Sequence, residues 1–141
     1  MEITELKSEE EWREAFPVMN ELRLELAEAE FLQLRESMAR DGYRLFAARD
    51  ENQIIALAGF AILTNLYYGR HAWVYDLVTA GAARSQGYGE RLLSFVEEFA
   101  RRENCSCVAL SSGLQRTDAH RFYAQRMEYN KTSFCFQKPL R

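Results

Sequence analysis

Apolar positions along the chain follow two periods, and the two periods predict its elements. Alternation of apolar and polar residues, or a short apolar run, predicts strands over residues 2–6, 43–49, 54–65, 71–79, 105–111 and 129–136. Apolar spacing of three to four residues predicts helices over residues 9–29, the next stretch as far as 42, 87–103 and about 117–127. The predicted order is β-α-α-β-β-β-α-β-α-β, a mixed α/β domain in which three consecutive strands are antiparallel.

Local signals refine these boundaries. Ser8-x-x-Glu11 is a capping box, so the first helix is expected to start near Glu9. Pro17 lacks a backbone donor, which predicts a kink or a restart inside that helix. Gly59 interrupts the longest strand and is expected to mark a bulge. The second helix is expected to turn three side chains inward: Phe31, Leu34 and Met38.

The composition is that of one folded domain spanning residues 1–141. The chain is 48% apolar and 13% aromatic, which excludes a disordered protein, and it is long enough to bury a core. A net charge of −3 argues against a nucleic-acid-binding protein. No signal-peptide pattern opens the sequence and no apolar run approaches the about 18 residues of a membrane helix. We therefore expect a cytoplasmic protein without a nucleic-acid or membrane partner.

Three cysteines, Cys105, Cys107 and Cys135, are an odd number for a chain that shows no export signal. Reduced thiols are therefore expected. The Cys105-x-Cys107 pair is half of a metal-binding pattern, but no second ligand pair follows at a suitable spacing. Buried structural thiols are the favoured interpretation, and no metal is expected.

Charge is distributed unevenly along the chain. Residues 1–40 contain eleven acidic and five basic side chains, and residues 41–141 contain ten acidic and thirteen basic ones. A solvated acidic helix surface produces such a pattern, and so does a protein that binds a cation with one half and an anion with the other. Charge alone favours the solvated surface.

The most informative stretch runs from Val74 to Leu93, where a strand enters a short loop and the loop opens a helix. Gly87 and Gly89 lie in the first turn of that helix, where glycine costs stability, so we infer that a ligand approaches the backbone there. Unpaired N–H groups at a helix start bind anions, and Arg84 and Ser85 add a cation and a hydroxyl donor. The stretch predicts a pyrophosphate cradle. The Walker pattern and the third glycine of GxGxxG are absent, so nucleotide-binding folds fit poorly.

The Arg84-x-x-Gly87-x-Gly89 spacing after an apolar strand resembles the acyl-CoA-binding motif of the GNAT superfamily of N-acetyltransferases, whose element order also matches nearly the whole chain. The resemblance implies the GNAT acyltransferase fold and acetyl-CoA as co-substrate. It implies that the cofactor is held by the loop residues Arg84, Ser85, Gln86, Gly87, Tyr88, Gly89 and Glu90.

A second motif, Asp118-Ala119-His120-Arg121-Phe122-Tyr123, supports the same resemblance. Tyr123 stands at the position of the tyrosine that the family carries seven residues after an Asn. Arg116 occupies the Asn position and Met127 the position of the usual Gly, so both depart from the pattern. Arg116 and His120, which shares a helix face with Tyr123, are candidates to contact the cofactor. An ordinary surface or capping role for His120 is the alternative.

The resemblance implies direct transfer of an acetyl group from acetyl-CoA to an amine. Backbone groups of Leu77, Val78 and Thr79 are expected to pair with the pantetheine arm, and an N–H among them to polarise the thioester carbonyl. Tyr123 is the candidate general acid that protonates the CoA thiolate. Asp76 is the candidate base or substrate-binding carboxylate. Alternation places it on the face of Val74 and Val78, so a structural role with a partner is the alternative.

The acceptor side is the least defined part of the prediction. Tyr75 is expected either to line the acceptor pocket or to pack in the core, and Glu28 and Glu30 are weaker candidates to hold a cationic acceptor. The leading interpretation is a small-molecule N-acetyltransferase, for which the charge distribution makes a cationic amine the first substrate to test. A protein or peptide N-acetyltransferase and a non-catalytic acetyl-CoA-binding module are the alternatives. Members of the family are often dimers, so a homodimer is also expected.

Overall fold

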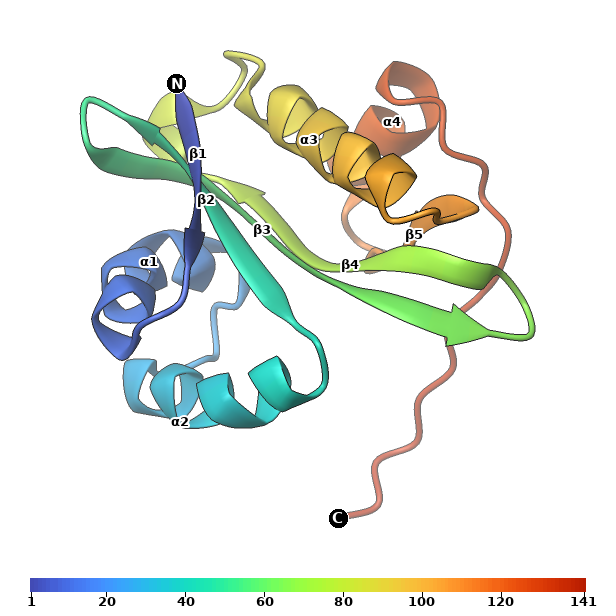
Figure 1. The fold of residues 1–141 in the computed structure, drawn as a ribbon, viewed down its shortest axis with the longest axis horizontal. Helices are drawn as coiled ribbons and strands as arrows, with labels where there is room; N and C mark the ends of the chain where they lie inside the picture. The colour runs from blue at the N-terminus through green and yellow to red at the C-terminus, as the bar shows by residue number, and fades with distance from the viewer. The chain divides into compact units, whose positions relative to one another are not determined.

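The strands of the N-terminal part of the chain form one sheet in the order β1-β2-β3-β4-β5 (Figure 1). The computed structural model describes residues 1–141, which divide into two units, residues 1–109 and residues 110–141. The strands are β1 (Glu2–Leu6), β2 (Arg44–Asp50), β3 (Gln53–Asn65), β4 (Gly69–Thr79) and β5 (Cys107–Leu110). The pairs from β1 to β4 are all antiparallel, as the alternating pattern predicted for the three central strands.

Helices cover both faces of this sheet in the first unit. Helices α1 (Glu9–Leu22) and α2 (Glu28–Arg40) lie on one face, and α3 (Tyr88–Arg102) lies on the other (Figure 1). On the α1 and α2 face, Trp12 stacks on Phe31 and meets the edge of Tyr43. On the α3 face, Phe60 of β3 packs against Phe99. Two apolar layers thus hold the sheet between them, and none of the helices is long and apolar enough to cross a membrane.

Helix α1 starts as predicted and ends earlier than predicted. The Ser8 hydroxyl accepts the Glu11 N–H at 3.1 Å, and the Glu11 carboxylate accepts the Ser8 N–H at 3.0 Å, which completes the capping box. The helix does not restart at Pro17 but runs through it to Leu22. The carbonyl that Pro17 leaves without a partner belongs to the exposed Arg13, where water can replace the lost bond.

Helix α2 buries less of its surface than its sequence predicted. Phe31 is buried between α1 and the sheet, as expected, whereas Leu34 is exposed. The prediction of Leu34 as an inward position is wrong because α2 contacts the rest of the unit along the narrow stripe that contains Phe31. The predicted helical continuation through Leu26 is also wrong, since residues 23–27 form the loop between the two helices.

The second unit has less regular structure than predicted. Helix α4 spans Thr117–Arg121 and continues as a π-helical turn, η2, over Phe122–Arg126. The predicted strand over residues 129–136 is wrong, because residues 128–141 contain no helix or strand. Phe134 and Phe136 alternate with polar residues but both are exposed, and a strand needs a partner for its backbone and a buried face for such side chains.

Candidate active site

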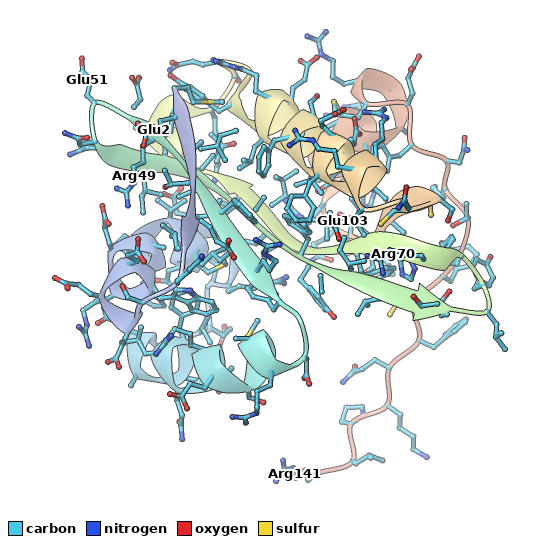
Figure 2. The ribbon with its side chains drawn as sticks, viewed as in Figure 1. Glu2, Arg49, Glu51, Arg70, Glu103 and Arg141 are labelled. Atoms are coloured by element: carbon cyan, nitrogen blue, oxygen red, sulfur yellow. The ribbon has the colours of Figure 1, made fainter.

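The C-terminal half of β4 has a free edge. Strand β5 starts beside the opposite end of β4, where the Ser106 N–H donates to the Arg70 carbonyl at 2.7 Å. The Arg70 guanidinium also donates to the Glu103 carbonyl at 2.6 Å and to its carboxylate at 3.2 Å, so these two side chains tie the end of α3 to the start of β4 (Figure 2). Because β5 has four residues and β4 has eleven, no strand flanks Leu77–Thr79 on the β5 side.

A bulge interrupts β4 just before this edge. Gly59 pairs with Asp76 and Phe60 pairs with Val74, so Tyr75 is the extra residue. The bulge at Gly59 was predicted, and it changes the alternation of β4. Val74 lies opposite Phe60 on the α3 face, so the prediction that it shares a face with Asp76 is wrong.

Tyr75 and Asp76 both face the α1 and α2 side because of this bulge. The Tyr75 ring lies 5.6 Å from the ring of Tyr43, and the Tyr75 side chain is 41% exposed. Tyr75 thus presents a half-exposed aromatic surface beside the free edge, and its place in an acceptor site stays a prediction.

The carboxylate of Asp76 is fully engaged. Arg23 donates to Oδ1 through Nε at 2.9 Å and through its terminal nitrogen at 2.7 Å, and the Tyr43 hydroxyl donates to Oδ2 at 2.6 Å. The same arginine donates to the Tyr75 carbonyl at 2.7 Å. Asp76 is only 7% exposed, and both of its carboxylate oxygens accept hydrogen bonds from side chains of this chain. These contacts agree with the alternative, a structural role with a partner, and the role of Asp76 as base or substrate-binding carboxylate stays a prediction.

Tyr43 is the neutral member of this network. Burial raises its pKa well above the usual value, and the neighbouring negative charge of Asp76 raises it further. The hydroxyl therefore keeps its proton and donates a hydrogen bond to the carboxylate. Gly59 makes room for this arrangement, since a Cβ at that position would lie 1.8 Å from the Tyr43 oxygen.

The loop after β4 is held by the end of α1. The Glu21 carboxylate accepts the Gly81 N–H at 2.8 Å and lies 3.4 Å from the Arg84 guanidinium. Arg84 Nε donates to the Thr79 carbonyl at 3.2 Å. The predicted phosphate-binding cation is thus paired with a carboxylate of its own chain in this structure.

The start of α3 has backbone features that suit the predicted anion cradle. Gly87, at the N-cap, has a φ of 83° and makes no side-chain cap, and Ser85 has a φ of 65°. Left-handed residues turn successive N–H groups toward one concave surface. The N–H groups of Tyr88 and Gly89 precede the first intrahelical bond, which runs from the Arg91 N–H to the Gly87 carbonyl. A Cβ on Gly87 would meet no atom within 4 Å, so the cradle is open.

Three other residues predicted to hold the cofactor, Gln86, Tyr88 and Glu90, lie next to the two glycines in the sequence. Gln86 is exposed and Glu90 is half-buried in the first turn of α3. The Tyr88 hydroxyl donates to Asp50 at 3.2 Å, and desolvation together with this bond raises its pKa. The Tyr88 side chain therefore ties the start of α3 to the end of β2.

The second unit contains the predicted acid and its neighbours. Tyr123 is half-buried, and its burial raises its pKa, while the charge and hydrogen bond of Arg116 partly offset that rise. His120 Nε2 donates to the Gly113 carbonyl at 2.8 Å. His120 thus holds the loop before α4, which favours its alternative, capping role over a contact with the cofactor.

The two glutamates predicted for the acceptor do not join Tyr75. Glu28 pairs with Arg13 at 3.5 Å, on the surface shared by α1 and α2, and Glu30 is exposed in the first turn of α2. Sequence reasoning missed Glu21, Arg23 and Tyr43 instead. Their one signal was indirect: a buried carboxylate on β4 required a cationic partner, but the pattern did not say which of the distant arginines supplies it.

Comparison with known proteins gives the class of this chain. Residues 7–129 match the acetyltransferase (GNAT) family, and the chain belongs to it. It is therefore an N-acetyltransferase, an enzyme of the acyltransferase class, and enzymes of this family use acetyl-CoA.

Individual relatives agree with that assignment. The chain is 42% identical over 139 residues to the uncharacterized N-acetyltransferase YhdJ of Bacillus subtilis (strain 168), covering 98% of each chain. It is 32% identical over 101 residues to the aminoalkylphosphonate N-acetyltransferase of Salmonella typhimurium, covering 70% of this chain and 62% of that protein. Among solved structures, an aminoglycoside N-acetyltransferase in complex with CoA matches with a TM-score of 0.83 and 14% identity, covering 99% and 94% of the two chains. This last likeness confirms the fold.

The structure contains no cluster of three or more His, Cys, Asp or Glu side chains arranged for a metal ion. Cys105 and Cys107 are half-buried, Cys135 is exposed, and all three are free thiols. Burial raises the pKa of the Cys105 thiol, so it stays protonated at neutral pH.

Proposed function

We propose that this chain transfers the acetyl group of acetyl-CoA directly to a primary amine of a small molecule. The observation that carries the proposal is the continuity of two binding surfaces: the free edge of β4 at Leu77–Thr79 leads, through a short loop, into the open cradle at the start of α3. The pantetheine arm of acetyl-CoA is extended and ends in a diphosphate, so the arm can lie along the strand edge while the diphosphate occupies the cradle.

The free edge supplies the groups that an extended thioester needs. Backbone N–H and C=O groups of a strand with no neighbour pair with an added strand-like chain. In the proposal, Leu77, Val78 and Thr79 hold the pantetheine arm, and an N–H of Leu77 or Val78 polarises the thioester carbonyl. Pairing with β3 resumes after the bulge at Tyr75 and continues to Thr79, so the backbone groups available to the arm are those on the opposite edge of β4.

The cradle supplies the anion site. The N–H groups of Tyr88 and Gly89, with the dipole of a fifteen-residue helix behind them, bind the diphosphate, and the absence of a side chain on Gly87 lets it approach. Arg84 adds a cation beside the loop, and in the proposal it exchanges Glu21 for the diphosphate or contacts both.

Tyr123 protonates the leaving CoA thiolate in this proposal. A general acid must carry its proton at neutral pH, and the burial that raises the pKa of Tyr123 ensures this. Arg116, at the position of the family's asparagine, stabilises the phenolate that forms when the proton leaves. In the proposal Asp76 is a positioning residue and not the general base, because both of its carboxylate oxygens accept hydrogen bonds.

The proposed acceptor is a small amine. The names of two relatives support this class: an aminoalkylphosphonate N-acetyltransferase and an aminoglycoside N(6')-acetyltransferase that is 29% identical over 97 residues. Tyr75, half-exposed beside the free edge, is the residue that we place against the acceptor. The homodimer remains a prediction.

A thiol-release assay tests the proposal. The purified chain is incubated with acetyl-CoA and separately with polyamines, aminoglycosides, aminoalkylphosphonates, amino acids and peptides, and free CoA thiol is followed. We expect turnover with one class of small amines and none with peptides. Release with peptides alone would establish the peptide N-acetyltransferase, and binding of acetyl-CoA without release in any arm would establish the non-catalytic module.

A further inference from the structure

The end of α1 contacts β4 on both sides of its free edge. Glu21, in the last turn, accepts the Gly81 N–H at 2.8 Å just beyond the edge. Arg23, the C-cap, donates to the Tyr75 carbonyl at 2.7 Å and to the Asp76 carboxylate at 2.7 and 2.9 Å just before it. The segment between these two anchors is Leu77–Thr79 with Ala80.

Both anchors are themselves fixed. The Asn20 side chain donates to the carbonyls of Arg23 and Leu26 at 2.8 and 3.1 Å, which holds the backbone that follows the helix. Asp76, the partner of Arg23, is buried and also bound by Tyr43. The end of α1 is therefore a rigid point from which two side chains reach β4 and the loop after it.

A strand edge without a neighbour has fewer backbone hydrogen bonds than the strands inside a sheet, and it opens more readily. A ligand that must order such an edge loses affinity, and an N–H that is displaced by about 1 Å loses much of its effect on a reacting carbonyl. Anchors at both ends of a short segment reduce both losses.

We propose that Glu21 and Arg23 are positioning residues that hold the free edge of β4 in its binding and reactive geometry. This inference rests on the proposed function, since it concerns the same edge. The two residues act at different steps. Glu21 adjoins the loop that leads to the cradle, so it affects chiefly CoA affinity. Arg23 adjoins the bulge and the first N–H of the edge, so it affects chiefly turnover.

A competing account gives Glu21 the opposite effect. Its carboxylate lies 3.4 Å from the Arg84 guanidinium, and a negative charge there competes with a diphosphate for the same cation. Under that account any loss of the charge strengthens CoA binding. Under the positioning account the oxygen that accepts the Gly81 N–H matters more than the charge. Glutamine at position 21 should therefore preserve CoA binding, and alanine should not.

The test for Glu21 is calorimetric titration with CoA, which involves no acceptor and no chemistry. Glu21→Ala is expected to weaken CoA binding about 10-fold, the effect of losing one good hydrogen bond to a charged acceptor. Glu21→Gln is expected to restore most of that loss. Glu25→Ala removes an exposed glutamate four residues further on and serves as the matched control. Tighter binding by both Glu21 variants, or a Glu21→Ala titration equal to that of the control, would overturn the inference.

The test for Arg23 separates turnover from binding. Arg23→Ala is expected to lower kcat about 100-fold while CoA affinity stays within about 3-fold, and Arg23→Lys to recover part of kcat. A thermal melt of each variant gives the folded fraction. If kcat and CoA binding fall together in proportion to the folded fraction, Arg23 is merely structural and the inference fails. If the wild-type chain does not bind CoA at all, the proposed function fails instead.

Discussion

The hydrogen bond between Tyr43 and Asp76 allows a quantitative prediction for the variant Tyr43→Phe. The two residues are 6% and 7% exposed, and the phenol oxygen lies 2.6 Å from Oδ2 of the carboxylate. The substitution removes one oxygen and leaves the ring in place. The carboxylate keeps both bonds from Arg23 but loses its only partner at Oδ2.

The expected loss in the free energy of unfolding follows from these contacts. A buried hydrogen bond to a charged group contributes about 1.5–3 kcal/mol, and here one carboxylate oxygen is left without a partner. The retained ring keeps its contacts with Trp12 and Tyr75, so no cavity adds to the cost. We expect Tyr43→Phe to lose about 2 kcal/mol at pH 7.

The same group makes this difference depend on pH. In the folded state the pKa of Tyr43 is raised well above its usual value, whereas in the unfolded chain it is about 10. Between those two values the unfolded state loses a proton that the folded state keeps, so stability falls as pH rises above about 10. This difference in the pKa of Tyr43 lowers the free energy of unfolding of the wild-type chain by about 1.4 kcal/mol at pH 11. The phenylalanine variant has no phenol at this position and does not lose this amount. The difference between the two proteins should therefore shrink to below about 1 kcal/mol.

Urea unfolding at pH 7 and pH 11 measures both effects. Tyr75→Phe is the matched control, because Tyr75 is the next tyrosine on the same surface and is 41% exposed, and it should change stability by less than about 0.5 kcal/mol. The reasoning is refuted if Tyr43→Phe behaves like this control at pH 7, or if its deficit is as large at pH 11 as at pH 7.

Three further predictions concern the bulge, the acid and the cradle. Gly59→Ala places a Cβ 1.8 Å from the Tyr43 oxygen and should cost about 3 kcal/mol or more in a denaturant titration; a loss under about 1 kcal/mol would show that the ring moves freely. Tyr123→Phe should lower kcat about 10²–10⁴-fold with acetyl-CoA affinity retained. Because Arg116 lowers the pKa of Tyr123, Arg116→Gln should shift the high-pH fall of kcat to still higher pH, and an unshifted profile would contradict the pairing. Gly87→Val, at a φ of 83°, should weaken CoA binding at least about 10-fold by calorimetry, and undiminished affinity would exclude the cradle.

The elements that the sequence predicted well are those with strong local signals. The structure shows the capping box at Ser8, Gly59 at the bulge and Gly87, with its positive φ, at the N-cap of α3. The family resemblance was confirmed for the same reason, since its first motif lies in one continuous loop and helix.

The features that could not be predicted depend on contacts between distant residues. In the network at Asp76, Tyr43 is 33 positions away along the sequence and Arg23 is 53 positions away. Nothing in the local sequence pattern distinguishes this tyrosine and this arginine from the others. The strand predicted for residues 129–136 failed because alternation describes a side-chain pattern and does not provide a pairing partner.

The uneven charge also has a more local explanation than a cation-binding half. Many acidic side chains of residues 1–40 form ion pairs within the chain, namely Glu5 with Arg44, Glu9 and Glu28 with Arg13, Glu14 with Arg49, and Glu21 with Arg84. Several of the partners come from the basic half of the sequence. The asymmetry thus partly reflects pairing of residues 1–40 with arginines of β2 and of the loop after β4, which a linear count cannot show.

The most direct test of the central claim is the stoichiometry of the reaction with a small amine. Acetyl-CoA and an aminoalkylphosphonate, and in parallel an aminoglycoside, are incubated with the chain, and the free CoA thiol and the N-acetylated acceptor are quantified together by mass spectrometry. The account predicts one acetylated small amine for each thiol released with at least one acceptor, and a loss of both products in Tyr123→Phe. Thiol release without an acetylated acceptor, or no release with any small amine, would contradict it.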